Sequence, residues 1–311
     1  MEVGETKCSS GYGNPPWTFK GRQVALYQLH LVKAETARAV IPKELRLVEA
    51  FGYTLGGFFL ASYEDSPAGA FDEVVHFHFS HSLPLLKRIV WNPPTSCAFR
   101  WAARVLVNSD EACDHGRKVE YVGLPSQVAR FTKRITAVQG QPKRKSSSFL
   151  NMIGLGTTTT CTPKGFMDLQ VSENKGHVAT DICNIKLATI GPTPKFDQRM
   201  GLAIKMSLPS FSGHSEYIPN LLKYSCHIEC RVRAVEPAKV SGPSFAPKED
   251  TRNLHQTANS ATEELIDNER NLSISVLLSK PIIALEFNCL KMQVEAPIVV
   301  ANCSKSSLKI S

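Results

Sequence analysis

The octapeptide GLPSQVAR, from Gly123 to Arg130, is the most informative stretch of the chain. A glycine and a proline flank Leu124, and these residue types favour a sharp, reproducible backbone bend. Because Ser126 and Gln127 follow the bend directly, we expect their side chains to be held in fixed positions and to point into a cavity. An apolar and basic strand is predicted to lead out of the bend, from Val128 to Ile135.

The composition is that of an ordinary soluble protein. The chain has 311 residues, of which 42% are hydrophobic and 21% charged, so it could hold one large β-rich domain or two smaller ones. No apolar run approaches the roughly 20 residues that cross a bilayer, so no transmembrane segment is predicted. Nine cysteines are scattered, and Cys97, Cys183 and Cys289 lie in apolar strand patterns. This favours reduced, buried thiols over a disulfide framework.

The net charge of +8 is partly concentrated in Lys133-Arg134 and in Lys143-Arg144-Lys145, which adjoins a serine run. These basic residues are not interleaved with aromatic residues, so they indicate solvated loops rather than a nucleic-acid partner.

Short apolar stretches with alternating polarity predict many strands. Short helices are expected over Lys33–Val40, before Pro42, and over Glu111–His115, which Asn108-Ser109-Asp110 caps and Gly116 ends. Strands are expected over Val24–Leu31, Gly52–Tyr63, Phe166–Val171, Ile182–Leu187, Ala203–Leu208, Ser225–Val235 and Pro281–Val300, the last long enough to divide in two. Strands that dominate in this way suit an antiparallel sheet curled around an interior.

The bend and the residues before it resemble the active-site segment of acetoacetate decarboxylases. In those enzymes a Gly-Arg-Glu stretch runs into aromatic-Pro-Lys-Lys, and one lysine of the pair forms a Schiff base with the keto acid. Its neighbour's charge lowers its pKa, so that the free amine exists near neutral pH. Here Gly116-Arg117-Lys118 precedes the bend, and Ser126 and Gln127 occupy the two lysine positions. Neither can form an imine, so the resemblance implies the scaffold without its catalytic amine.

Two other segments are similar to the same superfamily. Ala37–Leu45 matches its helix exit, and Ser66–Val75 matches a Gly-x-aromatic-x-Glu entry to a strand. The second match implies that Glu73 lines the pocket, although a strand-edge carboxylate on the surface is the alternative. The superfamily's pocket arginine has no counterpart, because the nearest position is Leu31.

Longer strings are similar to one plant family, the neoxanthin-deficient 1 family of acetoacetate decarboxylase-like proteins, over most of residues 11–300. These strings are Trp91–Ala98, Trp101–Asp110, Gly123–Arg130, Leu208–Gly213 and Asn220–Cys226. The resemblance implies a β-dominated α+β fold, in which an acetoacetate decarboxylase-like curled antiparallel sheet or barrel carries short peripheral helices. It also implies a role in the biosynthesis of the xanthophyll neoxanthin, a carotenoid upstream of abscisic acid.

The expected organisation is a flexible leader at 1–15, a single domain at 16–300 and a tail at 301–311. Loop excursions are expected near 76–88, 136–165 and 236–271, the last with a helix around Thr262–Arg270. His76–Arg88 is not a simple alternating strand, and both it and Phe99-Arg100 depart from the family pattern. They are interpreted as insertions, and the longer one as an alternative exon boundary or unspliced sequence.

The candidate ligand-binding residues are Glu73, Arg117, Ser126, Gln127 and Arg130. Of these, Glu73 is also a catalytic candidate. The two arginines bracket the bend, where each could bind an oxygenated ligand or pair with a surface carboxylate. Serine catalysis is disfavoured, since no Gly-x-Ser-x-Gly elbow and no adjacent base are present.

No cofactor and no metal are predicted. His76, His78 and His81 form a His-x-His-x-x-His pattern without an evident carboxylate ligand. Cys226 and Cys230 share one strand face at a spacing that differs from zinc knuckles, which favours buried structural thiols. No phosphate-binding or dinucleotide fingerprint is present.

The first hypothesis is a non-catalytic accessory protein that binds an apolar oxygenated ligand, such as a xanthophyll, or a pathway enzyme. The alternatives are an enzyme acting on a xanthophyll epoxide, with Glu73 as acid or base, and a decarboxylase using another lysine such as Lys118. The N-terminus, Met1 to Gly13, resembles neither a secretory signal nor a transit peptide. This favours the cytoplasm, whereas the pathway favours the chloroplast. The oligomeric state stays open.

Overall fold

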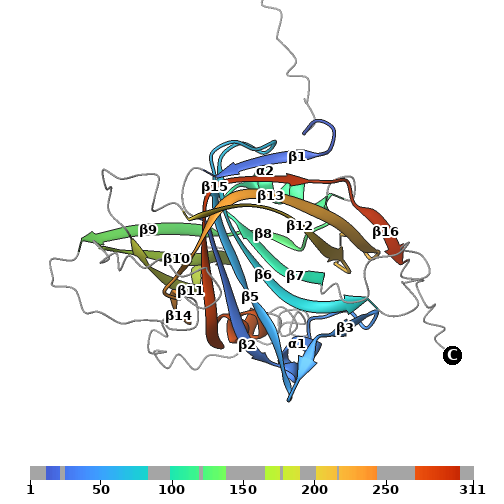
Figure 1. Cartoon of the computed structure of the whole chain (residues 1–311), viewed down its shortest axis with the longest axis horizontal. Coiled ribbons are helices and arrows are strands. Elements are labelled where there is room, and N and C mark those ends of the chain that lie inside the picture. The colour runs from blue at the N-terminus through green and yellow to red at the C-terminus, as the bar shows by residue number, and fades with distance from the viewer. Residues whose placement is uncertain are drawn as a thin grey trace, which may run out of the picture.

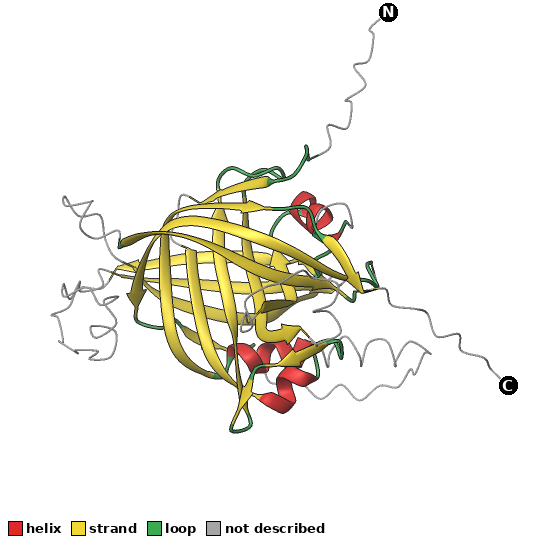
Figure 2. Ribbon diagram, turned by 45° about the vertical axis from the view of Figure 1, so that its right-hand side comes forward, coloured by secondary structure: helices red, strands yellow, loops and turns green. Residues whose placement is uncertain are grey.

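The computed structural model describes residues 12–21, 25–82, 99–118, 122–137, 165–175, 178–189, 201–215, 217–243 and 270–301. Within these residues, strands dominate and curl around a common interior, and short helices lie at the periphery (Figure 1, Figure 2). This arrangement confirms the predicted β-dominated fold.

Seven strands of the larger sheet form a closed barrel. Around the ring the order is β15, β2, β5, β6, β7, β12 and β13, and the pairing of β13 with β15 closes it. Their bounds are β2 (Ala25–Lys33), β5 (Tyr53–Tyr63), β6 (Phe71–Ser82), β7 (Phe99–Val107), β12 (Leu202–Gly213), β13 (Leu221–Val235) and β15 (Lys280–Val294). Neighbouring strands are antiparallel except β7 and β12, which are parallel. Alternate residues face the interior, as Tyr224, Cys226 and Ile228 do on β13.

Five short strands extend the barrel at its edges. They are β1 (Trp17–Gly21), β3 (Leu45–Leu47), β4 (Glu49–Ala50), β8 (Ser126–Val128) and β16 (Ile298–Ala301). The strand β8 begins with the first residue after the bend and pairs with β7 in parallel. This pairing fixes the bend to the barrel wall.

A four-stranded sheet packs against the outside of the barrel. It consists of β14 (Lys239–Ser241), β11 (Val178–Thr189), β10 (Gly165–Lys175) and β9 (Arg130–Ala137), in that order. One hydrophobic cluster joins Leu169 and Ile182 of this sheet to Phe58 and Leu106 of the barrel. The helical residues 270–277 add Ile274 and Leu277 to that cluster.

The two predicted short helices are confirmed. They are α1 (Ala34–Arg38) and α2 (Asp110–Arg117). Ser109 is the N-cap of α2, and its side chain accepts a hydrogen bond from the backbone N–H of Ala112 at 3.2 Å. The helix continues one residue beyond Gly116.

The prediction of one strand from Val128 to Ile135 is wrong. The strand β8 ends at Val128 and β9 begins at Arg130, and the two belong to different sheets. Between them Ala129 is buried, and its N–H donates to the carbonyl of Val107 at 2.7 Å. The chain therefore passes from barrel to outer sheet within one residue.

The prediction of irregular structure from His76 onward is wrong for the residues described. The strand β6 runs to Ser82, and its buried residues His76 and His78 alternate with Phe77 and Phe79. Residues 83–88 lie outside the described residues.

The prediction that Cys289 is buried is also wrong. Cys289 is exposed and has a left-handed backbone, with φ of 52°, where β15 changes register. As predicted, Pro281–Val300 divides into two strands, β15 and β16. Cys97 lies outside the described residues.

Residues 1–11, 138–164, 244–269 and 302–311 lie outside the described residues, and they include most of the expected leader, of the two longer loops and of the tail. The strand β14 lies within the loop expected at 236–271, so that prediction is wrong for these residues. Of the helix expected around Thr262–Arg270 only Arg270 is described, as the first of the helical residues 270–277. Within the described ranges, no helix is both long and apolar enough to span a bilayer.

Candidate functional site

The barrel interior contains a cavity of about 100 Å³. Its wall is mostly aromatic and aliphatic, with contributions from Phe19, Phe59, Phe71, Phe77 and Phe287. A smaller polar set faces the same space: Tyr63, Glu73, Arg100, His115, Ser126, Ser210 and Tyr224. A concave, mostly apolar space with a few polar groups is the usual form of a small-molecule site.

The carboxyl group of Glu73 faces this cavity from β6. The residue is 9% exposed, and its Oε2 accepts a hydrogen bond from the Tyr63 hydroxyl at 2.9 Å. Burial raises the pKa of Glu73 to about 7, although the hydrogen bond from Tyr63 opposes the shift. Near neutral pH this group therefore exists in both protonation states, and either could serve a ligand.

The bend places Ser126 at the cavity wall. Gly123 has φ of 58°, and a Cβ there would lie 2.6 Å from a methyl group of Ile218, so the position requires glycine. The Leu124 N–H donates to the carbonyl of Gly116 at 2.8 Å, which ties the bend to α2. Ser126 is 1% exposed and packs directly on Gly116, where a Cβ would lie 2.4 Å from its hydroxyl.

Arg117 supports the bend from outside the cavity. Its Nε donates to the carbonyl of Ser126 at 2.7 Å, and its guanidinium carbon lies 4.5 Å from the ring centroid of Tyr217. The side chain is not part of the cavity wall. The geometry thus gives Arg117 a positioning role rather than contact with a ligand.

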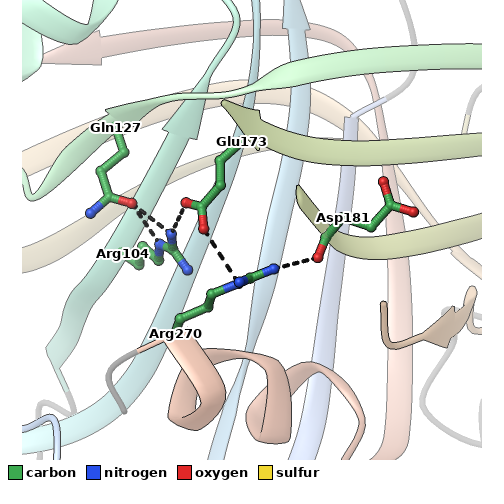
Figure 3. A network of polar contacts seen from close by, with 5 residues as sticks. All are labelled: Arg104, Gln127, Glu173, Asp181 and Arg270. Atoms are coloured by element: carbon green, nitrogen blue, oxygen red, sulfur yellow. Dashed lines mark hydrogen bonds and ion pairs between the residues drawn. The ribbon is translucent and has the colours of Figure 1, made fainter. Parts of the chain in front are cut away.

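Gln127 points away from the cavity, contrary to expectation. Adjacent residues of a strand face opposite sides, so its side chain lies between the barrel and the outer sheet (Figure 3). There its Oε1 accepts hydrogen bonds from Arg104 Nε at 3.0 Å and Nη2 at 2.6 Å. Arg104 Nη2 also donates to Glu173 Oε2 at 2.9 Å, and Arg270 Nε lies 3.3 Å from Glu173 Oε1.

Arg130, the other predicted arginine, is exposed at the start of β9 and does not line the cavity. The sequence had suggested a choice between ligand binding and surface pairing for each arginine. The position of Arg130 on the outer sheet separates it from the cavity.

The cavity does contain an arginine that the sequence analysis missed. Arg100 lines it from β7, with its guanidinium carbon 5.8 Å from the ring centroid of Tyr27 and 5.9 Å from that of Phe77. Phe99 and Arg100 had been interpreted as an insertion before Trp101. A usable signal was present, because Arg100 is a charged residue at the beginning of an apolar strand.

The buried histidines lie on both sides of the wall. His115 faces the cavity, and edge-on contacts with Tyr12 and Trp17 cover it, with centroid distances of 4.5 and 5.5 Å. His76 and His78 are on the opposite face of β6 from Glu73. Among the residues described, no group of three or more His, Cys, Asp or Glu has the arrangement of a metal site.

None of the described residues that line the cavity is a lysine. Lys118, the alternative Schiff-base candidate, follows α2, and its Nζ lies 5.5 Å from the ring centroid of Tyr12. It is not part of the cavity wall.

The sequence is highly similar to three plant proteins that share one name. The chain is 60% identical over 309 residues to "Protein NEOXANTHIN-DEFICIENT 1" of Solanum lycopersicum, covering 98% of this chain and 99% of the relative. Proteins of the same name from Arabidopsis thaliana and Oryza sativa subsp. japonica are 59% and 50% identical, covering 96% and 99% of this chain and 99% and 97% of the relatives. No family model matches the sequence.

Solved structures share the fold at low sequence identity. An acetoacetate decarboxylase from Legionella pneumophila is 12% identical with a TM-score of 0.51, covering 97% of this chain and 94% of that one. The enduracididine biosynthesis enzyme MppR, complexed with pyruvate, is 11% identical with a TM-score of 0.50, covering 95% and 94%. These similarities establish the acetoacetate decarboxylase-like fold.

Proposed function

Because the chain belongs to the NEOXANTHIN-DEFICIENT 1 family of acetoacetate decarboxylase-like proteins, we propose that it supports neoxanthin formation, upstream of abscisic acid, as a ligand-binding accessory protein. The observation that carries this proposal is a cavity in the barrel interior whose described wall holds Ser126 and no lysine. Imine chemistry requires a primary amine at the reacting carbonyl. Binding requires only the apolar wall and the few polar groups that face it.

The size of the cavity limits the ligand. About 100 Å³ holds several water-sized groups, which suits a small ring-sized molecule. A xanthophyll is a long polyene with an oxygenated ring at each end, so only one end could enter. The ligand is therefore either one xanthophyll end group or a separate small molecule.

Filling the cavity should abolish the function. Ala102 is buried in the cavity wall on β7, and Ala102→Leu would place three further carbons in that space. In plants that lack the endogenous gene, we expect this variant to leave neoxanthin at the level of the untransformed line. Leaf pigments separated by chromatography provide the measurement.

Ala188→Leu is the matched control, because Ala188 is exposed on β11 and the substitution adds the same bulk outside the cavity. It should restore neoxanthin fully. Purified Ala102→Leu must first show a cooperative melting transition near that of the unmodified protein. If such a folded variant restores neoxanthin, the cavity is not used.

A second candidate function is an enzyme acting on a xanthophyll epoxide, and the pKa of Glu73 near 7 favours it. A general acid or base works best when its pKa lies near the operating pH. Glu73→Gln preserves size and still accepts the hydrogen bond from Tyr63, but it cannot transfer a proton. An accessory protein should tolerate the change, whereas an enzyme should lose about 100-fold or more of its rate. Neoxanthin accumulation in the complemented plants distinguishes the two.

A further inference from the structure

The hairpin formed by β4 and β5 ends in a fully exposed phenylalanine. Glu49 pairs with Thr54 and Ala50 with Tyr53, so the turn between the strands consists of Phe51 and Gly52 alone. The Phe51 side chain is 100% exposed, the largest exposed fraction of any large hydrophobic side chain in the described residues. Its ring therefore packs against no part of the described protein, although phenylalanine is a residue type that usually lies in a core.

The backbone at this turn makes the phenylalanine more unusual. Phe51 has φ of 54° and Gly52 has φ of 77°, the left-handed region that a two-residue type I′ turn requires at both positions. Asparagine, aspartate and glycine are favoured at the first of these positions, and a bulky side chain is disfavoured there. A single exposed apolar side chain is ordinary, but one on a disfavoured backbone points to a contact outside the chain.

The apolar tip extends beyond one ring. Ala50, Gly52 and Tyr53 are also exposed, so four consecutive uncharged residues form the end of the hairpin. The hairpin projects at the lower end of the barrel beside α1, where the Ala34 N–H donates to the Gly52 carbonyl at 2.9 Å (Figure 1). A narrow, convex tip offers far less than the roughly 800 Å² per partner of a stable protein interface, but it can enter a fluid apolar layer.

Basic residues outnumber acidic ones beside this hairpin. Between β2 and the turn, the basic residues are Lys33, Arg38, Lys43 and Arg46, all exposed, and the acidic ones are Glu35, Glu44 and Glu49. Each of the three carboxylates is paired with a lysine, an arginine or a histidine. In the part of the chain that the structure describes, no carboxylate pairs with Lys43 or Arg46. These two cations, and the net charge of +8, are complementary to a negatively charged surface.

We propose that the β4–β5 hairpin docks the protein on an anionic lipid surface, with the Phe51 ring inserted at the boundary between headgroups and acyl chains. Tyr53 then lies among the headgroups, where aromatic rings with a polar end are favoured, and Lys43 and Arg46 face the lipid phosphates. One ring and two cations supply modest attraction, so the docking is weak and reversible. It depends neither on the cavity nor on the function proposed above.

Cosedimentation of the full chain with vesicles measures the docking. We expect binding to vesicles of equal parts phosphatidylglycerol and phosphatidylcholine, and binding about tenfold weaker to phosphatidylcholine alone. Phe51→Asn should weaken binding to the anionic vesicles about tenfold, because it removes the apolar area that insertion takes out of water. Ile135→Asn is the matched control, since Ile135 is 77% exposed on β9 of the outer sheet, and it should bind as the unmodified protein does.

The same variant separates docking from folding. Asn-Gly is a preferred pair for a type I′ turn, so Phe51→Asn should melt at the temperature of the unmodified protein or above it. In Phe51→Trp, the introduced indole reports its own position. Vesicles with brominated acyl chains should quench the fluorescence of this variant more than that of the unmodified protein, in which Trp17 and Trp101 are buried.

Three results would overturn the proposal: no binding of the full chain to the anionic vesicles, equal binding by Phe51→Asn and the unmodified protein, or no additional quenching in Phe51→Trp. Sedimentation velocity without lipid tests the other possible occupant, a second copy of this chain. A dimer that Phe51→Asn abolishes would show that the tip contacts protein, and this result would also overturn docking on lipid.

Discussion

Lowering the pH from 7 to 5 should reduce the free energy of unfolding by about 4 kcal/mol. Burial lowers the pKa of His76 to about 3 and those of His78 and His115 to about 4, from an ordinary 6.5. Below pH 6.5 these three histidines therefore bind protons in the unfolded chain but stay neutral in the folded chain. Stability is present above that pH and is lost as the pH falls from 6.5 towards 4.

The magnitude follows from adding the opposing groups. At pH 5 each of the three histidines lowers the free energy of unfolding by about 2 kcal/mol, and together they lower it by about 6 kcal/mol. Glu73 acts in the other direction, because its folded pKa of about 7 lies above its unfolded value of 4.5. Its protonation raises the free energy of unfolding by about 2 kcal/mol between pH 7 and pH 5. The net loss is a large part of the total stability of an average domain.

Urea unfolding at several pH values measures this dependence. Glu73→Gln removes the opposing group, so its loss between pH 7 and pH 5 should grow to about 6 kcal/mol. His76→Phe places an uncharged ring beside Arg104 and should reduce the loss by about 2 kcal/mol. A stability that is the same at pH 5 and pH 7 in all three proteins would contradict the assignment of neutral, buried histidines.

Glu173→Gln should lower the free energy of unfolding by about 3–5 kcal/mol. The Glu173 side chain is 13% exposed and contacts both Arg104 and Arg270, whose side chains are 9% and 13% exposed. Without this carboxylate, two guanidinium charges remain buried side by side (Figure 3). The same change disturbs Arg104, which holds Gln127 and so anchors β8 behind Ser126.

Denaturant unfolding of the Glu173→Gln, Glu229→Gln and Arg104→Met/Glu173→Met variants tests this role of Glu173. Glu229→Gln is the matched control, because Glu229 pairs with Lys205 where the two side chains are 48% and 79% exposed, and it should have no measurable effect. The double variant Arg104→Met/Glu173→Met should be more stable than Glu173→Gln, since it leaves one fewer unpaired charge. If Glu173→Gln behaves like the control, the network does not stabilise the fold.

Much of the architecture could be predicted from local patterns. The short apolar stretches became strands where expected, and Ser109 caps α2 as its residue type indicated. The absence of the lysine pair was also visible, because residues 126 and 127 are serine and glutamine whatever the fold. Local chemistry of this kind depends on residue type and spacing alone.

The division of the candidate residues between cavity and exterior depended on pairing between strands. The sequence analysis expected both Ser126 and Gln127 in the cavity. Adjacent residues of a strand face opposite sides, but only the pairing of β8 with β7 shows that residues 126 and 127 lie on a strand and which side of it is the cavity. Likewise, the strand is interrupted at Ala129, and Arg130 begins a strand of the other sheet. This interruption follows from the packing between the two sheets.

Arg100 and Arg104 give the sharpest example. Four residues separate them, so a regular strand would place both on one face. In the structure His76 pairs with Arg104 and Phe77 with Ala102, which leaves Ala103 as an extra residue that reverses the alternation. Arg100 therefore lines the cavity while Arg104 joins the outer network. The sequence by itself determined which chemical groups the protein has and that a lysine pair is absent at the bend. Only the tertiary structure decided which groups meet in the cavity, because one extra residue within a strand changes the side to which every later side chain of that strand points.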